Sequence, residues 1–361
     1  EQPTKVRVMG QNLVVWRDDA GEPVVQSDLC VHRGGSLAGG WVQTGVNGHN
    51  CVVCPYHGWQ FDDSGACVRG PAASPEVTIP RKARTDTYPS AEKYGFVWAF
   101  LGDLPEDERP PMPELPGLDD ARAAEADGYR MVEGEFVWNA NIERVIENGA
   151  DIAHAPFVHA GSFGNPEKPE VPEHEIEEVW SDDGEFLRMI GATVDLDPPP
   201  AKGIWKYLRK ADERPPVTST VRIMFPNVSM LEVKLPLGTL RIWTAHVPID
   251  ENTTASRWIT GRDFFTEPWA VKLGEQMARL LTGRRAVVVA TTDLTHYGQA
   301  YHFRPTGSED APHEWMRRND QRLLDLVVHL EAERIIPEAA AHWNACGPGA
   351  LAAVVAYARA C

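Results

Sequence analysis

Two short stretches decide the fold of this chain: CVHRGG at residues 30–35 and CPYHGW at residues 54–59. Each stretch presents a cysteine and then a histidine, first Cys30 with His32 and then Cys54 with His57. Each also contains glycine, which is typical of a tight turn between strands. Two thiolates and two imidazoles suit either a structural zinc ion or a [2Fe-2S] cluster in which two His replace two Cys on one iron.

The order of the ligands separates these two kinds of site. In a Rieske cluster each loop gives its Cys to the inner iron and its His to the outer iron, so the repeated order is what the cluster requires. A zinc site would use Cys51 and Cys54 as a C-x-x-C pair, and that alternative stays open because Cys51 is present. We expect Cys30, His32, Cys54 and His57 to hold a Rieske [2Fe-2S] cluster.

The composition is that of an acidic globular protein. The 361 residues are 43% hydrophobic and 24% charged, and 52 Asp+Glu against 35 Lys+Arg give a net charge of −17. This charge disfavours nucleic acid and anionic lipid as partners. No apolar stretch reaches the roughly 18 residues of a membrane span, and residues 1–10 lack a signal-peptide layout. We therefore expect a cytoplasmic protein with no membrane partner.

The first hundred residues predict short strands separated by turns. Apolar, β-branched runs such as KVRVMG, NLVVW, EPVVQ and FVWAF alternate with turn signals such as DDAG, NGHN and DDSG. The segment LPEDERPPMPELPG at residues 104–117 is rich in acids and prolines, which predicts an extended, solvated boundary. We divide the chain into an all-β domain at residues 1–115 and a second domain at residues 116–361.

The second domain mixes helices with an antiparallel sheet. Apolar periodicity predicts helices over residues 136–154, 268–281 and 320–334. Between them, residues 217–235, 239–249 and 256–265 alternate apolar and polar side chains, as strands of a sheet with one packed face do. The fold class is therefore α+β, an all-β domain followed by a domain of antiparallel sheet and helices. In this sheet we expect His246 to be a satisfied histidine and not a ligand.

A second group of metal-binding side chains lies in IENGADIAHAPFVH at residues 146–159. Asp151 and His154 are three residues apart and would share one face of a helix. Pro156 would end or kink that helix and bring His159 back beside His154. Two imidazoles and one carboxylate form a facial triad that holds Fe(II) and leaves positions open for dioxygen. We expect a mononuclear iron site here.

Both groups resemble the α subunits of Rieske non-haem iron oxygenases. The likeness is carried by CVHRGGSLAGG, CPYHGWQFDDSGACV, YPSAEKYGFVWAFLGD and the pattern E-N-x-x-D-x-x-H-x-x-x-x-H, and it continues through most of the chain. The segment at residues 41–53 is longer than is usual in that family, which predicts an extended hairpin around Asn47 and Gly48 with an unchanged ligand set.

The resemblance implies roles for individual residues. His154 and His159 would be iron ligands, and Asp151 the carboxylate that connects the two metal centres. Head-to-tail packing in a homotrimer would bring a neighbour's cluster close, with Asp151 bridging His57 of one subunit to His154 of the next. An ionised carboxylate accepts N–H bonds from both imidazoles, which fixes their orientation and couples the sites.

The third iron ligand is less clearly marked. The candidates are four carboxylates: Asp263, Asp293, Asp320 and Asp325. We prefer Asp293, which lies where the family's carboxylate usually falls and follows the hydrophobic run at residues 286–290. That run would anchor it by packing, whereas Asp320 would lie on an exposed helix face. The family often has Glu or Gln before this Asp, and this chain has Thr292.

The resemblance implies an oxidoreductase that uses a Rieske cluster and Fe(II). Such an enzyme would monooxygenate or oxidatively dealkylate a small organic substrate, as α-only trimers such as the saxitoxin-tailoring hydroxylases do, with a cis-dihydroxylating dioxygenase as the alternative. No G-x-G-x-x-G motif follows a strand, so electrons would come from a separate reductase or ferredoxin. An electron carrier would need no second metal, and a zinc-binding module would need no oxygen chemistry.

Overall fold

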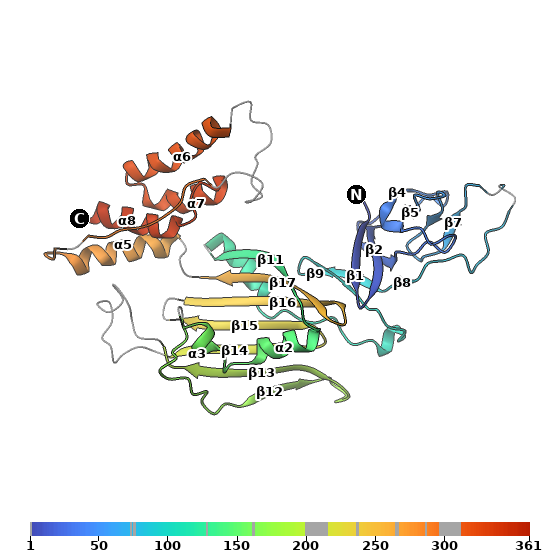
Figure 1. Cartoon of the computed structure of the whole chain (residues 1–361), viewed down its shortest axis with the longest axis horizontal. Coiled ribbons are helices and arrows are strands. Elements are labelled where there is room, and N and C mark those ends of the chain that lie inside the picture. The colour runs from blue at the N-terminus through green and yellow to red at the C-terminus, as the bar shows by residue number, and fades with distance from the viewer. Residues whose placement is uncertain are drawn as a thin grey trace.

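The computed structural model describes residues 2–72, 74, 77–127, 129–160, 163–198, 216–235, 238–263, 267–285, 287–295 and 312–361. It contains an N-terminal group of small antiparallel sheets, a larger antiparallel sheet and a group of C-terminal helices (Figure 1). The predicted α+β class, with an all-β N-terminal part, is confirmed. Among the described helices, none is both long and apolar enough to cross a membrane.

The N-terminal part is built from two four-stranded sheets. One has the order β1-β2-β3-β8, with bounds Thr4–Val8, Gln11–Arg17, Pro23–Ser27 and Thr87–Tyr88. The other has the order β4-β5-β6-β7, with bounds Trp41–Thr44, Asn50–Val53, Gln60–Phe61 and Cys67–Arg69. Strands β4 and β5 form the predicted hairpin, whose turn contains Gly48 with a positive φ of 82°. The core between the two sheets includes Cys30 and Cys54, so the predicted ligand loops start from the packed interior.

The chain then crosses to the larger sheet. The hairpin of β9 (Ser90–Lys93) and β10 (Phe96–Ala99) is followed by α1 (Leu118–Ala123), with short 3₁₀ turns before and after it at Glu106–Glu108 and Ala124–Asp127. A further 3₁₀ turn, Leu37–Gly39, lies in the N-terminal part between β3 and β4. Residues 104–117 are mostly exposed, as predicted, although Leu115 is buried. Leu115, Leu118 and Tyr94 share one core with Trp243 of the large sheet. This segment therefore packs on the large sheet.

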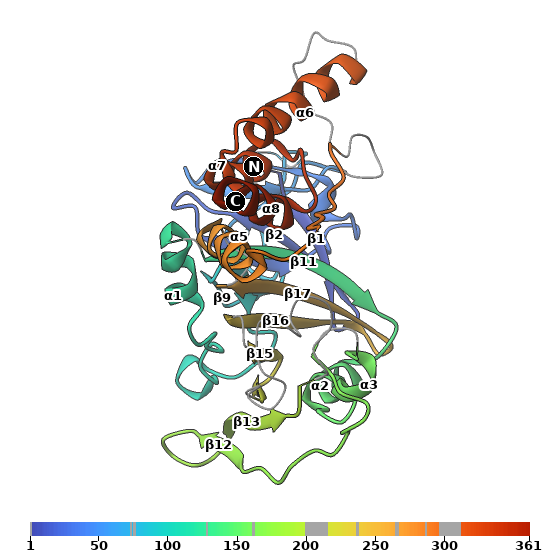
Figure 2. The same cartoon turned by 90° about the vertical axis from the view of Figure 1, so that its left-hand side faces the viewer.

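The large sheet has seven antiparallel strands in the order β11-β17-β16-β15-β14-β13-β12. Their bounds are Arg130–Trp138 for β11, Ile176–Trp180 for β12, Leu187–Leu196 for β13, Val217–Met224 for β14, Val228–Leu235 for β15, Gly238–Asp250 for β16 and Thr253–Arg262 for β17. Alternate side chains of a strand point to opposite faces. The face that carries Trp243 is covered by the segment from Tyr94 to Ala121, and α2 and α3 lie over the other face (Figure 2).

Helix α2 (Ile142–Ala150) is shorter than the predicted helix at residues 136–154. Residues 136–138 belong to β11, and α2 begins after Asn141, whose side chain accepts a hydrogen bond from the backbone N–H of Arg144 at 2.9 Å. Asp151 ends the helix in an extended conformation, with φ −71° and ψ 107°. The prediction that Pro156 ends this helix was wrong, because Pro156 lies at the start of the next helix, α3 (Ala155–Val158), where its missing N–H costs no hydrogen bond.

The remaining helices form a separate group beside the β11–β17 edge of the sheet (Figures 1 and 2). They are α5 (Glu267–Leu281), α6 (Pro312–Val328), α7 (Ala332–His342) and α8 (Pro348–Ala360), and they share a core of their own. The helix predicted at residues 268–281 is confirmed. The helix predicted at 320–334 was wrong in its bounds, because α6 starts at Pro312 and ends at Val328, before Leu330 takes a positive φ of 56°.

Candidate functional site

The two Cys-His loops have the same backbone hydrogen bonds. The N–H of Cys30 donates to the carbonyl of Gly35, and the N–H of Gly34 donates back to the carbonyl of Cys30, both at 2.8 Å. The second loop repeats this, because Cys54 donates to Trp59 at 2.8 Å and receives from Gly58 at 2.9 Å. Gly34 and Gly58 both have positive φ, 74° and 70°, which residues other than glycine rarely adopt. The two turns are therefore equivalent, as a cluster shared between two loops requires.

The four predicted side chains converge between these turns. Cys30 and Cys54 are buried and their thiols interact, and burial raises the pKa of the Cys30 thiol to about 11. The rings of His32 and His57 lie 4.7 Å apart between centroids. Burial, followed by repulsion from His57, lowers the pKa of His32, which favours the neutral imidazole that binds metal. The structure thus pairs sulfur with sulfur and nitrogen with nitrogen.

The donor atoms fit a Rieske [2Fe-2S] cluster. Nδ1 of His32 is buried and has no hydrogen-bond partner among the described residues, as expected of an atom that holds a metal. The ring of His32 is kept in place by parallel stacking on Trp59, with centroids 4.4 Å apart. The thiol of Cys51 instead lies near the hairpin turn, 3.5 Å from the carbonyl oxygen of His49. This placement favours the pairing of Cys30 with Cys54 over the C-x-x-C zinc alternative.

The second predicted group lies where α2 gives way to α3. His154 and His159 flank α3, and their ring centroids are 5.4 Å apart. Burial, followed by repulsion from His154, lowers the pKa of His159. Asp151 lies on the Nδ1 side of His154, with Oδ2 at 3.7 Å, although the two residues share a turn and not a helix face. The structure therefore brings together the predicted histidine pair and its neighbouring carboxylate.

The backbone around α3 holds the two imidazoles in place. The N–H of His159 donates to Ala155 at 3.1 Å, and the carbonyl of His159 accepts from Gly164 at 2.9 Å. Ala155 packs against Val194 and Leu196 of β13. Asp151 Oδ1 accepts the N–H of Ala153 at 2.8 Å, which closes the turn, while its side chain stays half exposed at 51%. Two adjacent imidazoles suit Fe(II), and Nδ1 of His154 is buried without a hydrogen-bond partner among the described residues.

The third ligand is not brought beside this pair. Within the described parts of the chain, no three His, Cys, Asp or Glu side chains converge closely enough to hold one metal ion. Asp293 is exposed, and its backbone exchanges hydrogen bonds with Cys346, to the thiol at 3.2 Å and from the N–H at 3.1 Å. The expected anchoring of residues 286–290 was wrong for two side chains, because Val287 and Val289 are 89% and 75% exposed. Asp293 as a ligand stays a prediction.

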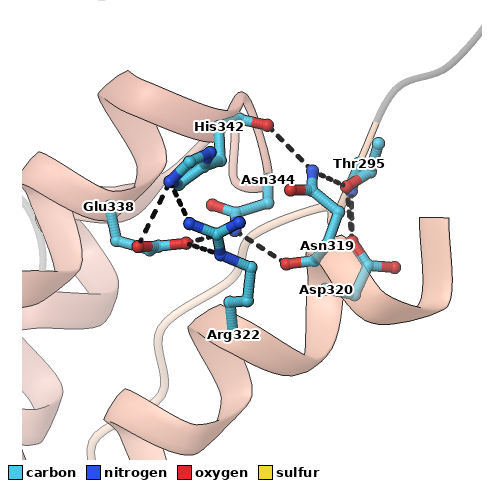
Figure 3. A network of polar contacts seen from close by, with 7 residues as sticks. All are labelled: Thr295, Asn319, Asp320, Arg322, Glu338, His342 and Asn344. Carbon is cyan, nitrogen blue, oxygen red and sulfur yellow. Dashed lines mark hydrogen bonds and ion pairs between the residues drawn. The ribbon is translucent and has the colours of Figure 1, made fainter. Parts of the chain in front are cut away.

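The other three candidates are engaged in hydrogen bonds within the protein. Asp320 accepts the N–H and the hydroxyl of Thr295 at 2.9 and 2.6 Å, in a polar network between α6 and α7 (Figure 3). Asp263 accepts the N–H of Thr239 at 2.6 Å, and Asp325 accepts an amide N–H of Gln321 at 2.7 Å. All three carboxylates therefore accept hydrogen bonds from neighbouring parts of the protein.

Two regions of the chain match known families. Residues 1–89 match the family described as Rieske [2Fe-2S] domain, and residues 138–288 match the vanillate O-demethylase oxygenase C-terminal domain. The solved structure of NdmB from Pseudomonas putida CBB5 has a TM-score of 0.58 with this chain at 25% identity, covering 78% of this chain and 73% of that one.

Curated relatives match parts of this chain. Aminopyrrolnitrin oxygenase of Pseudomonas fluorescens is 34% identical over 44% of this chain, and the chlorophyllide a oxygenase of Chlamydomonas reinhardtii is 35% identical over 43%. The chain spans only 42% and 22% of the lengths of these two proteins. Methylxanthine N3-demethylase of Pseudomonas putida is 30% identical over 74% of this chain and 69% of its own length. With this relative and with both domains matched in order, the chain belongs to the Rieske non-haem iron oxygenases.

Proposed function

We propose that this chain is the oxygenase component of a monooxygenase that hydroxylates or oxidatively dealkylates a small organic substrate. One atom of dioxygen enters the substrate and the other leaves as water, with two electrons and two protons supplied from outside the substrate. The observation that carries the proposal is that one chain holds two separate groups of metal-binding side chains. The first is Cys30, His32, Cys54 and His57 on the two loops, and the second is the histidine pair at α3. An electron carrier needs only the first of these.

The family's two cofactors divide the chemistry between these two groups of side chains. The Rieske cluster supplies single electrons, and the non-haem Fe(II) binds and activates dioxygen. The chain's own residues would hold these cofactors and orient the side chains that bind them. His154 and His159 would hold the iron, and the half-exposed Asp151 places a carboxylate oxygen 3.7 Å from Nδ1 of His154. Stacking on Trp59 keeps His32 in a single ring plane.

We also propose that electrons pass between subunits of a homotrimer. Asp151 is half exposed and lies against His154, so a neighbouring subunit's His57, which is exposed at its loop tip, has access to the free side of the carboxylate. Such head-to-tail contacts between three subunits would close into a ring. The electrons would enter from a separate reductase or ferredoxin, in a cytoplasmic setting. We propose residues 1–115 for the cluster domain and 116–361 for the catalytic domain, with Tyr94 and Leu115 of the first range packed into the core of the large sheet.

A stepwise experiment tests the activity. The purified protein, reconstituted with iron and supplied with a chemical reductant and a ferredoxin, is screened against N-methyl and O-methyl aromatic compounds, because a relative is a methylxanthine N3-demethylase. Substrate-dependent oxygen uptake with release of formaldehyde supports dealkylation. With ¹⁸O₂, one labelled atom per hydroxylated product supports monooxygenation, and two labelled atoms would show the alternative, a cis-dihydroxylating dioxygenase. Reduction of the cluster with no oxygen consumption against any compound would favour an electron carrier.

A further inference from the structure

A chain of hydrogen bonds, buried at its centre, crosses four strands of the large sheet. The indole N–H of Trp138 on β11 donates to the hydroxyl of Ser256 on β17 at 2.9 Å. Ser256 Oγ also lies 2.9 Å from Nδ1 of His246 on β16, and Nε2 of His246 lies 2.9 Å from the hydroxyl of Ser229 on β15. Ser256 is fully buried and His246 is 6% exposed. Side-chain networks this well buried and satisfied specify a single arrangement of the groups they join.

Two directions of these bonds satisfy every group. An indole N–H is a donor only, so Ser256 accepts from Trp138. The Ser256 hydroxyl then either donates to Nδ1 of His246, with Nε2–H donating to Ser229, or accepts a second time from Nδ1–H, with Nε2 accepting from the hydroxyl of Ser229. Burial lowers the pKa of His246 to about 4, so the ring is neutral at ordinary pH and holds one of these two tautomers.

This series of hydrogen bonds ends at Trp138, where the polypeptide leaves the sheet to form α2. Trp138 is the last residue of β11, and α2 begins after Asn141. A second buried hydroxyl supports the same connection, because Thr254 donates to the carbonyl of Ala140 at 3.0 Å. The residues of the chain lie on the sheet face opposite Trp243, the face over which α2 packs on β14, β16 and β17 (Figure 2). The start of α2 is therefore tied to the sheet from beneath.

We propose that His246 is a positioning residue for the iron site and acts through Ser256 and Trp138 to set the start of α2. The inference rests on the proposed function, because it takes the iron to be held by the histidines of α3. Helix α2 has nine residues and ends directly at Asp151, with His154 three residues further on. A helix moves as a rigid rod over such a length, so a shift at its first turn is carried to Asp151 and His154. Outer residues that orient metal ligands commonly change metal affinity by about 10- to 100-fold when removed.

Two matched serine variants separate positioning from general support of the sheet. Ser256→Ala cuts the chain between His246 and Trp138, whereas Ser229→Ala removes the same hydroxyl on the far side of His246. We expect Ser256→Ala to weaken Fe(II) binding at the mononuclear site by about tenfold or more and Ser229→Ala by less than about threefold. The measurement is a titration of the trimeric, cluster-loaded protein with Fe(II) after chelation of the mononuclear iron. Cluster absorbance and thermal unfolding are recorded on the same samples.

The histidine itself is tested by its closest replacement. His246→Gln presents one donor and one acceptor at its tip, so it can give to Ser229 and accept from Ser256, and we expect it to restore iron affinity to within about threefold of the wild-type value. His246→Ala, if it folds, should resemble Ser256→Ala. Wild-type iron affinity in both serine variants, or the same loss of iron affinity in both, would overturn the positioning role. An altered KM with unchanged iron affinity in His246→Gln would overturn it too, by placing His246 at the substrate. A wild-type protein that binds no mononuclear iron would instead refute the proposed function.

Discussion

Replacement of Gly164 by alanine tests how closely the fold holds the iron histidines. Gly164 is buried, and its N–H donates to the carbonyl of His159 at 2.9 Å. A Cβ built on this glycine would lie 2.2 Å from the carbonyl oxygen of Ala155 and 2.8 Å from that of Pro156. Both oxygens belong to the backbone of α3, so they cannot rotate away as a side chain would. The segment at residue 164 and α3 must separate.

The size of the effect follows from these distances. Ordinary contacts begin near 3.4 Å, so the backbone must shift by roughly 1 Å. Extra methyl groups in packed sites cost about 1–3 kcal/mol. If this cost falls on the arrangement of His154 and His159, Fe(II) binding weakens by about 10- to 100-fold. The cluster is held by separate loops, so its absorbance should stay unchanged.

A glycine in α2 provides the control. A Cβ at Gly149 would meet nothing within 4 Å, and alanine is about 1 kcal/mol better than glycine inside a helix. We expect Gly149→Ala to keep full iron affinity and to be as stable as the wild type or slightly more stable. The assay is iron content per cluster, by metal analysis and visible absorbance, followed by Fe(II) titration. Gly164→Ala with wild-type iron affinity would refute the idea that α3 sets the geometry of the pair.

Four other predictions test separate parts of the account. Asp151→Asn should retain both metals and the oligomer yet slow turnover severely, because an amide oxygen accepts more weakly than a carboxylate; turnover close to that of the wild type would remove the bridging role. Cys51→Ser should leave the visible spectrum of the cluster intact, and its loss would revive the zinc-type pairing. Asp293→Ala should lose the mononuclear iron while the cluster persists, whereas iron lost in Asp320→Ala instead would assign the third ligand to α6. Because the folded pKa of His246 is about 4 against an ordinary 6.5, the unfolded chain takes up a proton first as pH falls. The free energy of unfolding should therefore drop by up to about 3 kcal/mol between pH 6.5 and pH 4, and His246→Gln should remove this part of the slope in chemical denaturation.

The cluster site was predictable because its signal is local. Two loops with the same Cys-then-His order need only turn geometry to bring four ligands together, and the positive φ values of Gly34 and Gly58 provide it. The histidine pair was also predicted, but for a wrong reason. Helix α2 already ends at Asp151, and Pro156 starts α3. A proline at the first turn of a helix and one that ends a helix look alike in a sequence.

Long-range contacts account for what the sequence did not reveal. The partners of His246 come from β15 and β17, and Trp138 of β11 joins through Ser256, so these hydrogen bonds depend on strand register, which one sequence does not specify. The hydrophobic run before Asp293 suggested anchoring, but Val287 and Val289 are exposed. Apolar composition alone does not show whether a segment is packed against the rest of the chain or exposed.

The most direct test of the account is the iron content of the purified wild-type protein combined with its electron paramagnetic resonance spectrum after reduction. The account predicts about three irons per chain, two in the cluster and one at the mononuclear site, and the low-average-g signal of a cluster with histidine ligands. Chelation should remove the mononuclear iron and leave that signal unchanged. About two irons per chain with the same signal would contradict the oxygenase assignment, and zinc without iron would contradict both sites.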